Sequence, residues 1–155
     1  MKLHFLVASV AVFAVALASA PAVASDKTDV MAVVNKAVAD FNKADLKAWA
    51  ADCGDQPFII DDIAPYHWDG AGACSDWWRD YEADAKKNGI TDGAVKIAAV
   101  RHVDITADHA YVVLTANFGF KQNGKPGAQN GSSFALVVNK AAAGWRISGW
   151  SWVPK

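Results

Sequence analysis

The sequence lacks the short motifs that identify several large classes of enzyme. It contains no GxSxG, GxGxxG or phosphate-loop pattern, and Gly124-Lys125 falls in an expected hairpin turn with no helix after it. No two histidines stand at a metal-ligand spacing on one expected element. Covalent serine catalysis, nucleotide binding and a metal site therefore have no support, and we expect no cofactor.

The chain also lacks an excess of charge of either sign. It has 15 Lys and Arg residues against 16 Asp and Glu residues, a formal net charge of −1. Proteins that bind nucleic acid or anionic membranes concentrate positive charge on one surface. The sequence gives no electrostatic reason to expect either partner.

Residues 1–24 have the pattern of a cleaved export signal. Lys2 precedes an apolar stretch, and Ala22-Val23-Ala24 supplies the small residues of a cleavage site. The stretch is shorter than the roughly 20 strongly apolar residues that a membrane span needs. We expect cleavage after Ala24, a single domain over residues 25–155, and a periplasmic or secreted protein.

Cysteine is scarce, since Cys53 and Cys74 are the only two. An exported protein meets an oxidising compartment, in which a disulfide between them can persist. Two free buried thiols are the alternative, because cysteine often packs as a small hydrophobe. We favour the disulfide.

Apolar residues at helical spacing predict three helices in the first half of the chain. The first starts near Thr28 and has one buried stripe, formed by Val30, Val34, Ala37, Val38 and Phe41. The second has Asp45 as its cap and Gly54 as its stop. A short strand over residues 58–63 precedes the third helix, which spans residues 73–88.

The second half alternates with the period of strands, and short connectors between its runs predict an antiparallel meander. The four predicted strands cover residues 95–105, 109–121, 132–140 and 145–153. Alternation separates the residues that face the helices from those that face outward. The inward set is Val95, Ile97, Ala99, Val103, Ile105, Ala110, Val112, Leu114, Ala116, Phe118, Phe120, Phe134, Leu136, Val138, Trp145 and Ile147.

The outward side of this sheet is unusually apolar. Its members are Tyr111, Val113, Ala135, Val137, Trp150 and Trp152. A contiguous apolar patch on a small exported domain indicates a partner surface. We expect a homodimer through it, with Tyr111, Val113, Trp150 and Trp152 in the interface.

Four local phrases carry a resemblance to a known superfamily. They are FNKADLKAWAADC, WDGAGACSDWW, DHAYVV and GWRISGWSW. With the order of the elements, they resemble the nuclear transport factor 2-like superfamily, and in particular its small exported bacterial members without assigned activity. The resemblance implies an α+β cone in which three N-terminal helices pack on a curved antiparallel sheet. The same cone hosts ketosteroid isomerases, scytalone dehydratase, polyketide cyclases and binding or assembly modules, so it does not decide the chemistry.

The stretch FIIDDIAPYHWDG places two aspartates in an apolar run near the open end of such a cone. Pleating predicts that Asp61 and Asp62 point to opposite faces, so that at most one enters the cavity. That carboxylate could act as a general base on a carbon acid, as the isomerase resemblance implies, with His67 as acid or base and Tyr66 as oxyanion donor. Alternatively, both aspartates cap or solvate the end of a strand.

Arg101 interrupts the inward apolar face of its strand. It could clamp an acid group of a ligand, or a β-bulge at Arg101-His102 could let the guanidinium leave the core. The aromatic side chains Trp77, Trp78 and Tyr81 either fill the core or form a stacking platform. The candidate ligand contacts are Trp68, Trp78, Tyr81 and Arg101.

Three functions remain open at this point. The first is an exported domain that binds a small apolar molecule, possibly one with an acid group, in the cone. The second is a cofactor-free isomerase, dehydratase or cyclase that uses Asp61 or Asp62 with His67. The third is a dimeric protein-interaction module.

Overall fold

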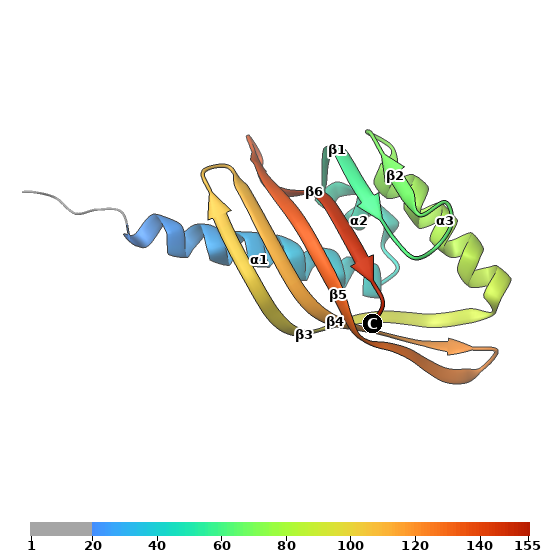
Figure 1. Cartoon of the computed structure of the whole chain (residues 1–155). Helices are drawn as coiled ribbons and strands as arrows, with labels where there is room; N and C mark the ends of the chain where they lie inside the picture. Colours follow the sequence, from blue (N-terminus) through green and yellow to red (C-terminus); the bar gives the residue numbers. More distant parts are fainter. Residues whose placement is uncertain (1–19) are drawn as a thin grey trace, which may run out of the picture.

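Three helices lie on one side of a bent six-stranded sheet (Figure 1). The computed structural model describes residues 20–155, with side chains from residue 26 onward. Residues 1–19 of the expected export signal lie outside the described residues, and residues 20–24 belong to the first helix. The elements in chain order are α1 (Ala20–Asn42), α2 (Leu46–Asp52), β1 (Cys53–Ile60), β2 (His67–Asp69), α3 (Ala73–Asn88), β3 (Ile90–Thr106), β4 (His109–Gln122), β5 (Lys125–Ala141) and β6 (Gly144–Val153).

The sheet has the order β2-β1-β6-β5-β4-β3. Its neighbours are antiparallel except for β1 and β6, which run parallel. The expected α+β cone is confirmed, but the sheet is mixed instead of wholly antiparallel. The reason is that β1 and β6 are far apart in the chain, so no hairpin fixes their relative direction.

The first helix begins at Ala20, before the predicted start near Thr28, whereas the other helices lie close to their predicted positions. Asp45 caps α2, since its Oδ1 accepts a hydrogen bond of 3.0 Å from the Ala48 backbone N–H. α2 ends at Asp52 with Cys53 as its C-cap, so Gly54 directly follows the cap, as predicted, and already belongs to β1. The third helix has its predicted bounds and ends at Gly89, whose φ of 65° suits a glycine C-cap.

The connector between β4 and β5 is shorter than expected. Asn123 and Gly124 have φ values of 49° and 79°, which is the left-handed pair that a two-residue hairpin turn requires. Residues 125–131, which the composition assigned to a loop, are therefore part of β5. The longer hairpin extends beyond β6, remains paired with β3 up to Gln122 (Figure 1), and contributes one wall of a cavity.

A bulge in β6 reverses the faces predicted for its second half. Val138 pairs with Ile147 but Val137 pairs with Gly149, so Ser148 is the extra residue. One extra residue moves every later side chain to the other face. The prediction that Trp150 and Trp152 face outward is wrong: they are 6% and 9% exposed and lie on the inner face.

Two further bulges in β3 cancel each other. The register with β4 shifts at Ala98 and again at Arg101, so the later inward residues of β3 keep their predicted face. Ala99 lies between the bulges and pairs with Thr115 on the outer face, contrary to the prediction. Arg101 lies at the second bulge and is exposed. Of the two alternatives for this residue, the structure therefore has the bulge that lets the guanidinium leave the core.

The core joins the apolar stripe of α1 to the inner face of the sheet through a group of aromatic rings. Trp77 is central to this group, with its ring centroid 5.2 Å from that of Trp49 and 4.9 Å from that of Trp150. The predicted disulfide between Cys53 and Cys74 is confirmed and ties the start of β1 to the first turn of α3. In the part of the chain that is described, no helix has the length and apolarity to cross a membrane.

Candidate ligand cavity

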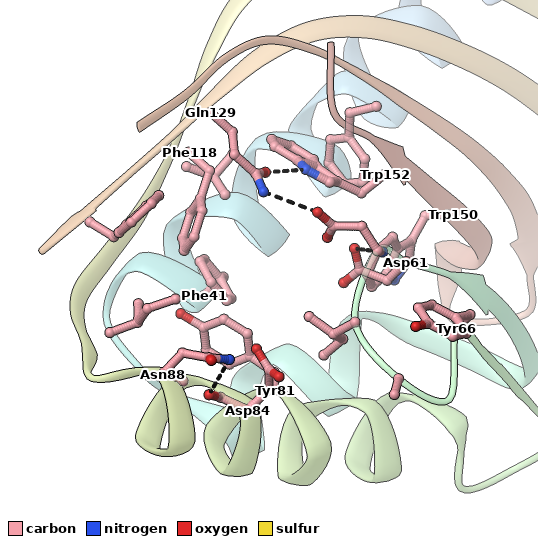
Figure 2. Close-up of a pocket in the computed structure, with 18 of the residues that line it drawn as sticks. Phe41, Asp61, Tyr66, Tyr81, Asp84, Asn88, Phe118, Gln129, Trp150 and Trp152 are labelled. Carbon is pink, nitrogen blue, oxygen red and sulfur yellow. Dashed lines mark hydrogen bonds between the residues drawn. The ribbon is translucent and has the colours of Figure 1, made fainter. Parts of the chain in front are cut away.

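A cavity of about 470 Å³ opens between α3, the long hairpin and the loop after β1 (Figure 2). Most of its lining consists of aromatic and aliphatic side chains contributed by all three helices and by the sheet. The aromatic members are Phe41, Trp49, Tyr66, Tyr81, Phe118, Phe120, Phe134, Trp150 and Trp152. The polar members are Asp61, Asp62, Asp84, Lys87, Asn88 and Gln129. A volume of this size and composition is typical of sites for small molecules.

Asp61 is held at the inner end of the loop that follows β1. Its backbone N–H donates to the Tyr66 carbonyl at 3.3 Å, which closes the loop. Its Oδ2 accepts a hydrogen bond of 2.7 Å from the Trp77 indole, and its Oδ1 accepts one of 2.8 Å from the Asp62 backbone N–H. Since a carboxylate offers about four acceptor positions, Asp61 retains capacity for a ligand.

The surroundings of Asp61 raise its pKa to about 7. Burial is the largest cause, because it penalises the charged carboxylate. The hydrogen bonds from Trp77 and from the Asp62 backbone oppose this effect, while the Asp62 side chain adds to it. A carboxyl group with a pKa near neutrality is able both to accept and to return a proton.

Asp62 also lines the cavity, so the expectation that at most one of the two aspartates enters it is wrong. Strand pleating does not apply to this pair because β1 ends at Ile60. Asp62 Oδ2 accepts a hydrogen bond of 3.0 Å from Gln129 Nε2, and Gln129 Oε1 accepts one of 2.9 Å from Trp152 Nε1. Figure 2 shows this chain of contacts linking the sheet to the loop.

His67 does not converge with the aspartates, contrary to the prediction. It pairs with Ile60 across β1 and β2, and directly opposed residues share a face of the sheet. That face is the outer one, where the His67 ring lies 5.1 Å from the ring of Phe58. Tyr66 does line the cavity, at its edge, with 61% of its surface exposed.

Of the four predicted ligand contacts, the structure places only Tyr81 in the cavity wall. Trp68 and Trp78 are buried in the core, and the Trp68 indole donates to Asp80 at 2.9 Å. Arg101 is exposed and is not among the lining residues. The reason for expecting a ligand with an acid group is thereby removed.

Gln129 was missed because residues 125–131 were assigned to a loop, whereas they belong to β5, in which a bulge sets the position of Gln129. Ala116 pairs with Ser132 but Phe118 pairs with Gln129, so one residue of β5 is extra near Gly131. Gly131 has a φ of 75°, and its N–H donates to Asn117 Oδ1 at 2.8 Å. The glycine in Asn130-Gly131 was the available signal, since glycine within a strand often marks a bulge.

The cone, with a cavity that opens at one end, is the architecture of nuclear transport factor 2-like proteins. The model of one family within this class, described as the SnoaL-like domain, matches residues 30–151, and the chain belongs to that family. No protein with a curated description matches the chain.

Solved structures support the fold alone, because their sequence identities are low. A nuclear transport factor 2-like protein from Novosphingobium aromaticivorans has a TM-score of 0.70 at 13% identity, covering 86% of this chain and 84% of that one. A superfamily member from Salmonella enterica serovar Typhimurium has a TM-score of 0.70 at 15% identity, covering 85% and 92%. A protein from Erwinia carotovora atroseptica described as ketosteroid isomerase-like has a TM-score of 0.61 at 18% identity, covering 83% and 96%.

Proposed function

We propose that the cavity binds a small, largely apolar molecule whose polar group contacts Asp61. The observation that carries this proposal is the combination of an aromatic wall with one hydrogen-bonded, mostly buried carboxyl group. Apolar rings supply the free energy of binding through the surface they bury, and a single polar group fixes the orientation.

Calorimetric titration with neutral naphthylmethanol tests the proposal. Ala85 lines the cavity from α3, so Ala85→Phe should fill part of it and weaken binding at least about tenfold. Ala83 is exposed on the same helix, and Ala83→Phe provides the matched control that should bind normally. Absence of binding to the wild type, or equal binding by the two variants, would rule the proposal out.

A second candidate, proton transfer, is favoured by the pKa of Asp61 near neutrality. Asp61 would take a proton from a carbon next to a carbonyl and return it to the same carbon or to a conjugated one, with no cofactor. Tyr66, at the cavity edge, is the candidate donor to the oxyanion, and His67 has no part. In deuterated water, the hydrogens next to the carbonyl of a cyclic ketone should exchange for deuterium when the wild type is present. NMR measures this exchange, which should disappear when Asp61→Asn replaces the wild type.

We also infer that the chain forms a homodimer through the outer face of the sheet. The side chains that support this are exposed and apolar, namely Phe58, Ile60, Tyr111, Val137 and Val153. Partly buried Val113 lies beside them, whereas Trp150 and Trp152 do not contribute their rings. A second copy of the chain offers the same apolar surface, as a two-fold interface requires.

We propose that the amino-terminal residues are a signal that directs export of the protein. Residues 1–24 would be removed, leaving residues 25–155 as the domain in the periplasm or outside the cell. The disulfide supports an oxidising compartment. The mass of the protein recovered from an exporting bacterial host tests this, because retention of residues 1–24 would contradict it.

A further inference from the structure

The charges that line the cavity are almost all negative. Asp61, Asp62 and Asp84 contribute carboxylates, while Lys87 is the one basic side chain among the described lining residues. Lys87 is exposed on α3, so solvent already satisfies its charge. A ligand that enters this cavity therefore meets carboxylates and aromatic rings.

Asp61, which is mostly buried, and its exposed neighbour Asp62 at the cavity mouth have only neutral hydrogen-bond donors. Asp61 receives the Trp77 indole N–H and a backbone N–H, and Asp62 receives the amide of Gln129. Among the ion pairs of residues 26–155, none includes either aspartate. Two neighbouring carboxylates without a counterion repel each other, and a cation placed between them and the rings would remove that repulsion.

The rings suit a cation as well. The faces of Trp and Tyr rings attract ammonium groups, most strongly where water is excluded. Trp49, Trp150 and Trp152 are buried, and Tyr81 adds a fourth ring from α3. An acid group would have the opposite effect in this place, because it would lie beside two carboxylates of the same charge.

We propose that the ligand of this cavity is an apolar molecule with a protonated amine, which Asp61 and Asp62 bind while the aromatic rings surround its apolar part. The inference rests on the proposed binding function and specifies the class of ligand. It is independent of the proton-transfer candidate.

The state of Asp61 makes amine binding depend on pH. Burial raises the pKa of this carboxyl to about 7, and a bound cation would favour its charged form. The other titratable side chains that line the cavity are Asp62 and Tyr66 on the same loop and Tyr81, Asp84 and Lys87 on α3. The described lining residues of α1, α2 and the sheet are not titratable. Affinity for an amine should therefore increase as the pH rises through neutrality.

Three probes with the same naphthalene ring separate the possibilities in calorimetric titrations: naphthylmethylamine, naphthylmethanol and naphthoate. At about pH 8 the amine should bind about tenfold more tightly than the alcohol, as one charge-assisted hydrogen bond provides. At about pH 5.5, where Asp61 is protonated, this preference should fall to about threefold or less. Naphthoate should bind most weakly at the higher pH.

Substitutions of single aspartates test which carboxylate causes the preference for the amine over the alcohol. Asp61→Asn should remove most of the amine preference and its pH dependence while the alcohol still binds, since Asn keeps an acceptor for Trp77. Asp104→Asn removes the same charge from an exposed position of β3 and should behave as the wild type. Asp62→Asn serves as a second test, expected to halve the preference or more, and thermal melting checks that all three fold.

The outcomes distinguish the two proposals. If the alcohol binds but the amine has no advantage, or if naphthoate binds best, the inference is wrong and the binding function stands. An amine preference that survives in both Asp61→Asn and Asp62→Asn also overturns it. If none of the probes binds the wild type, both proposals fall together.

Discussion

Asp61 differs from the exposed aspartates of the chain in how little water reaches its carboxyl group. The indole of Trp77 supplies one fixed donor, and the adjacent backbone N–H supplies another. These bonds favour the charged form, but burial outweighs them and the pKa rises to about 7. A carboxyl group with this pKa is partly protonated near neutral pH. A charged or polar ligand group beside Asp61 would shift that pKa further.

Asp61 should make the protein less stable as the pH rises. Between the unfolded pKa of about 3.9 and the folded value near 7, the folded chain holds a proton that the unfolded chain has released. The free energy of unfolding therefore falls over this range, by about 4 kcal/mol in total, because each pKa unit corresponds to about 1.4 kcal/mol. Asp61→Asn lacks this loss, so relative to the wild type it should gain most of it, about 3.5 kcal/mol, between about pH 4 and about pH 8.

Urea unfolding of the wild type and Asp61→Asn at both pH values measures this difference, in which the other titrating groups cancel. Asp104→Asn, altered at an exposed carboxylate, should follow the profile of the wild type. If Asp61→Asn also follows that profile, the carboxyl of Asp61 does not have a raised pKa.

At the scale of elements, α1 and α2 are joined by a charged cluster that is separate from the cavity. Lys36 Nζ lies 2.6 Å from Asp40 Oδ2 and 2.7 Å from Asp52 Oδ1, and both aspartate side chains are under 10% exposed. Hydrogen bonding by Lys36 lowers the pKa of Asp40, whereas burial raises the pKa of Asp52. The lysine thus holds together two carboxyl groups that would otherwise repel each other.

Lys36→Met should reduce the free energy of unfolding by about 2 kcal/mol, because it leaves two buried carboxyl groups without their main cation. Lys43→Met is the matched control, since Lys43 lies 3.8 Å from Asp40 and is 70% exposed. Its effect should stay within about 0.5 kcal/mol, as for other exposed pairs. Chemical denaturation of the two variants compares them, and equal losses would show that the cluster has no special role.

The bulge in β6 depends on a close approach between strands. A Cβ added at Gly149 would lie 2.9 Å from the carbonyl oxygen of Phe58, a backbone atom that cannot rotate away. Gly149→Ala should therefore lower the free energy of unfolding by about 2 kcal/mol and weaken probe binding, because Trp150 follows directly. Gly119→Ala meets no atom within 4 Å and should be neutral. Thermal melting compares the pair, and a harmless Gly149→Ala would contradict this account of the bulge.

These bulges also explain what could be predicted from the sequence. Helix periods, the Asp45 cap and the alternation of the long strands depend on neighbours in the chain and were predicted, although β3 and β5 begin earlier than expected. The faces of Trp150 and Gln129 depend on extra residues at Ser148 and near Gly131, which only the pairing with another strand defines. The aspartates of the site stood out as polar residues in an apolar run, but the strand end that lets both enter the cavity was not visible.

For the whole molecule, the disulfide joins the two elements that form the Asp61 contact. Cys53 starts β1, which leads to Asp61, and Cys74 lies in the first turn of α3, which presents Trp77. Together with the parallel pairing of β1 and β6, this bridge holds the loop against the helix. Stability and the geometry of the cavity are therefore linked.

Loss of the disulfide should destabilise the chain by about 3 kcal/mol, because the bridge spans a sequence separation of 21 and restricts the unfolded state. Urea unfolding should show this loss in the free energy of unfolding for the double variant Cys53→Ala and Cys74→Ala. The wild type should become as unstable as the double variant only after its disulfide is reduced. The double variant itself should not respond to reductant. A wild type that is equally stable with and without reductant would contradict the expectation.

If the chain dimerises through the outer face of the sheet, a charge introduced on that face should separate the two copies. Val137 is 42% exposed in the second half of β5, and a lysine there would bring two charges into a two-fold apolar interface. Val137→Lys should raise the dimer dissociation constant at least about tenfold, measured by sedimentation over a range of concentrations. Leu46→Lys makes the same change at an apolar side chain that is 40% exposed on α2, away from this face, and should leave the dimer intact. A wild type that sediments as a monomer throughout, or a Val137→Lys variant as dimeric as the wild type, would exclude this face as the interface.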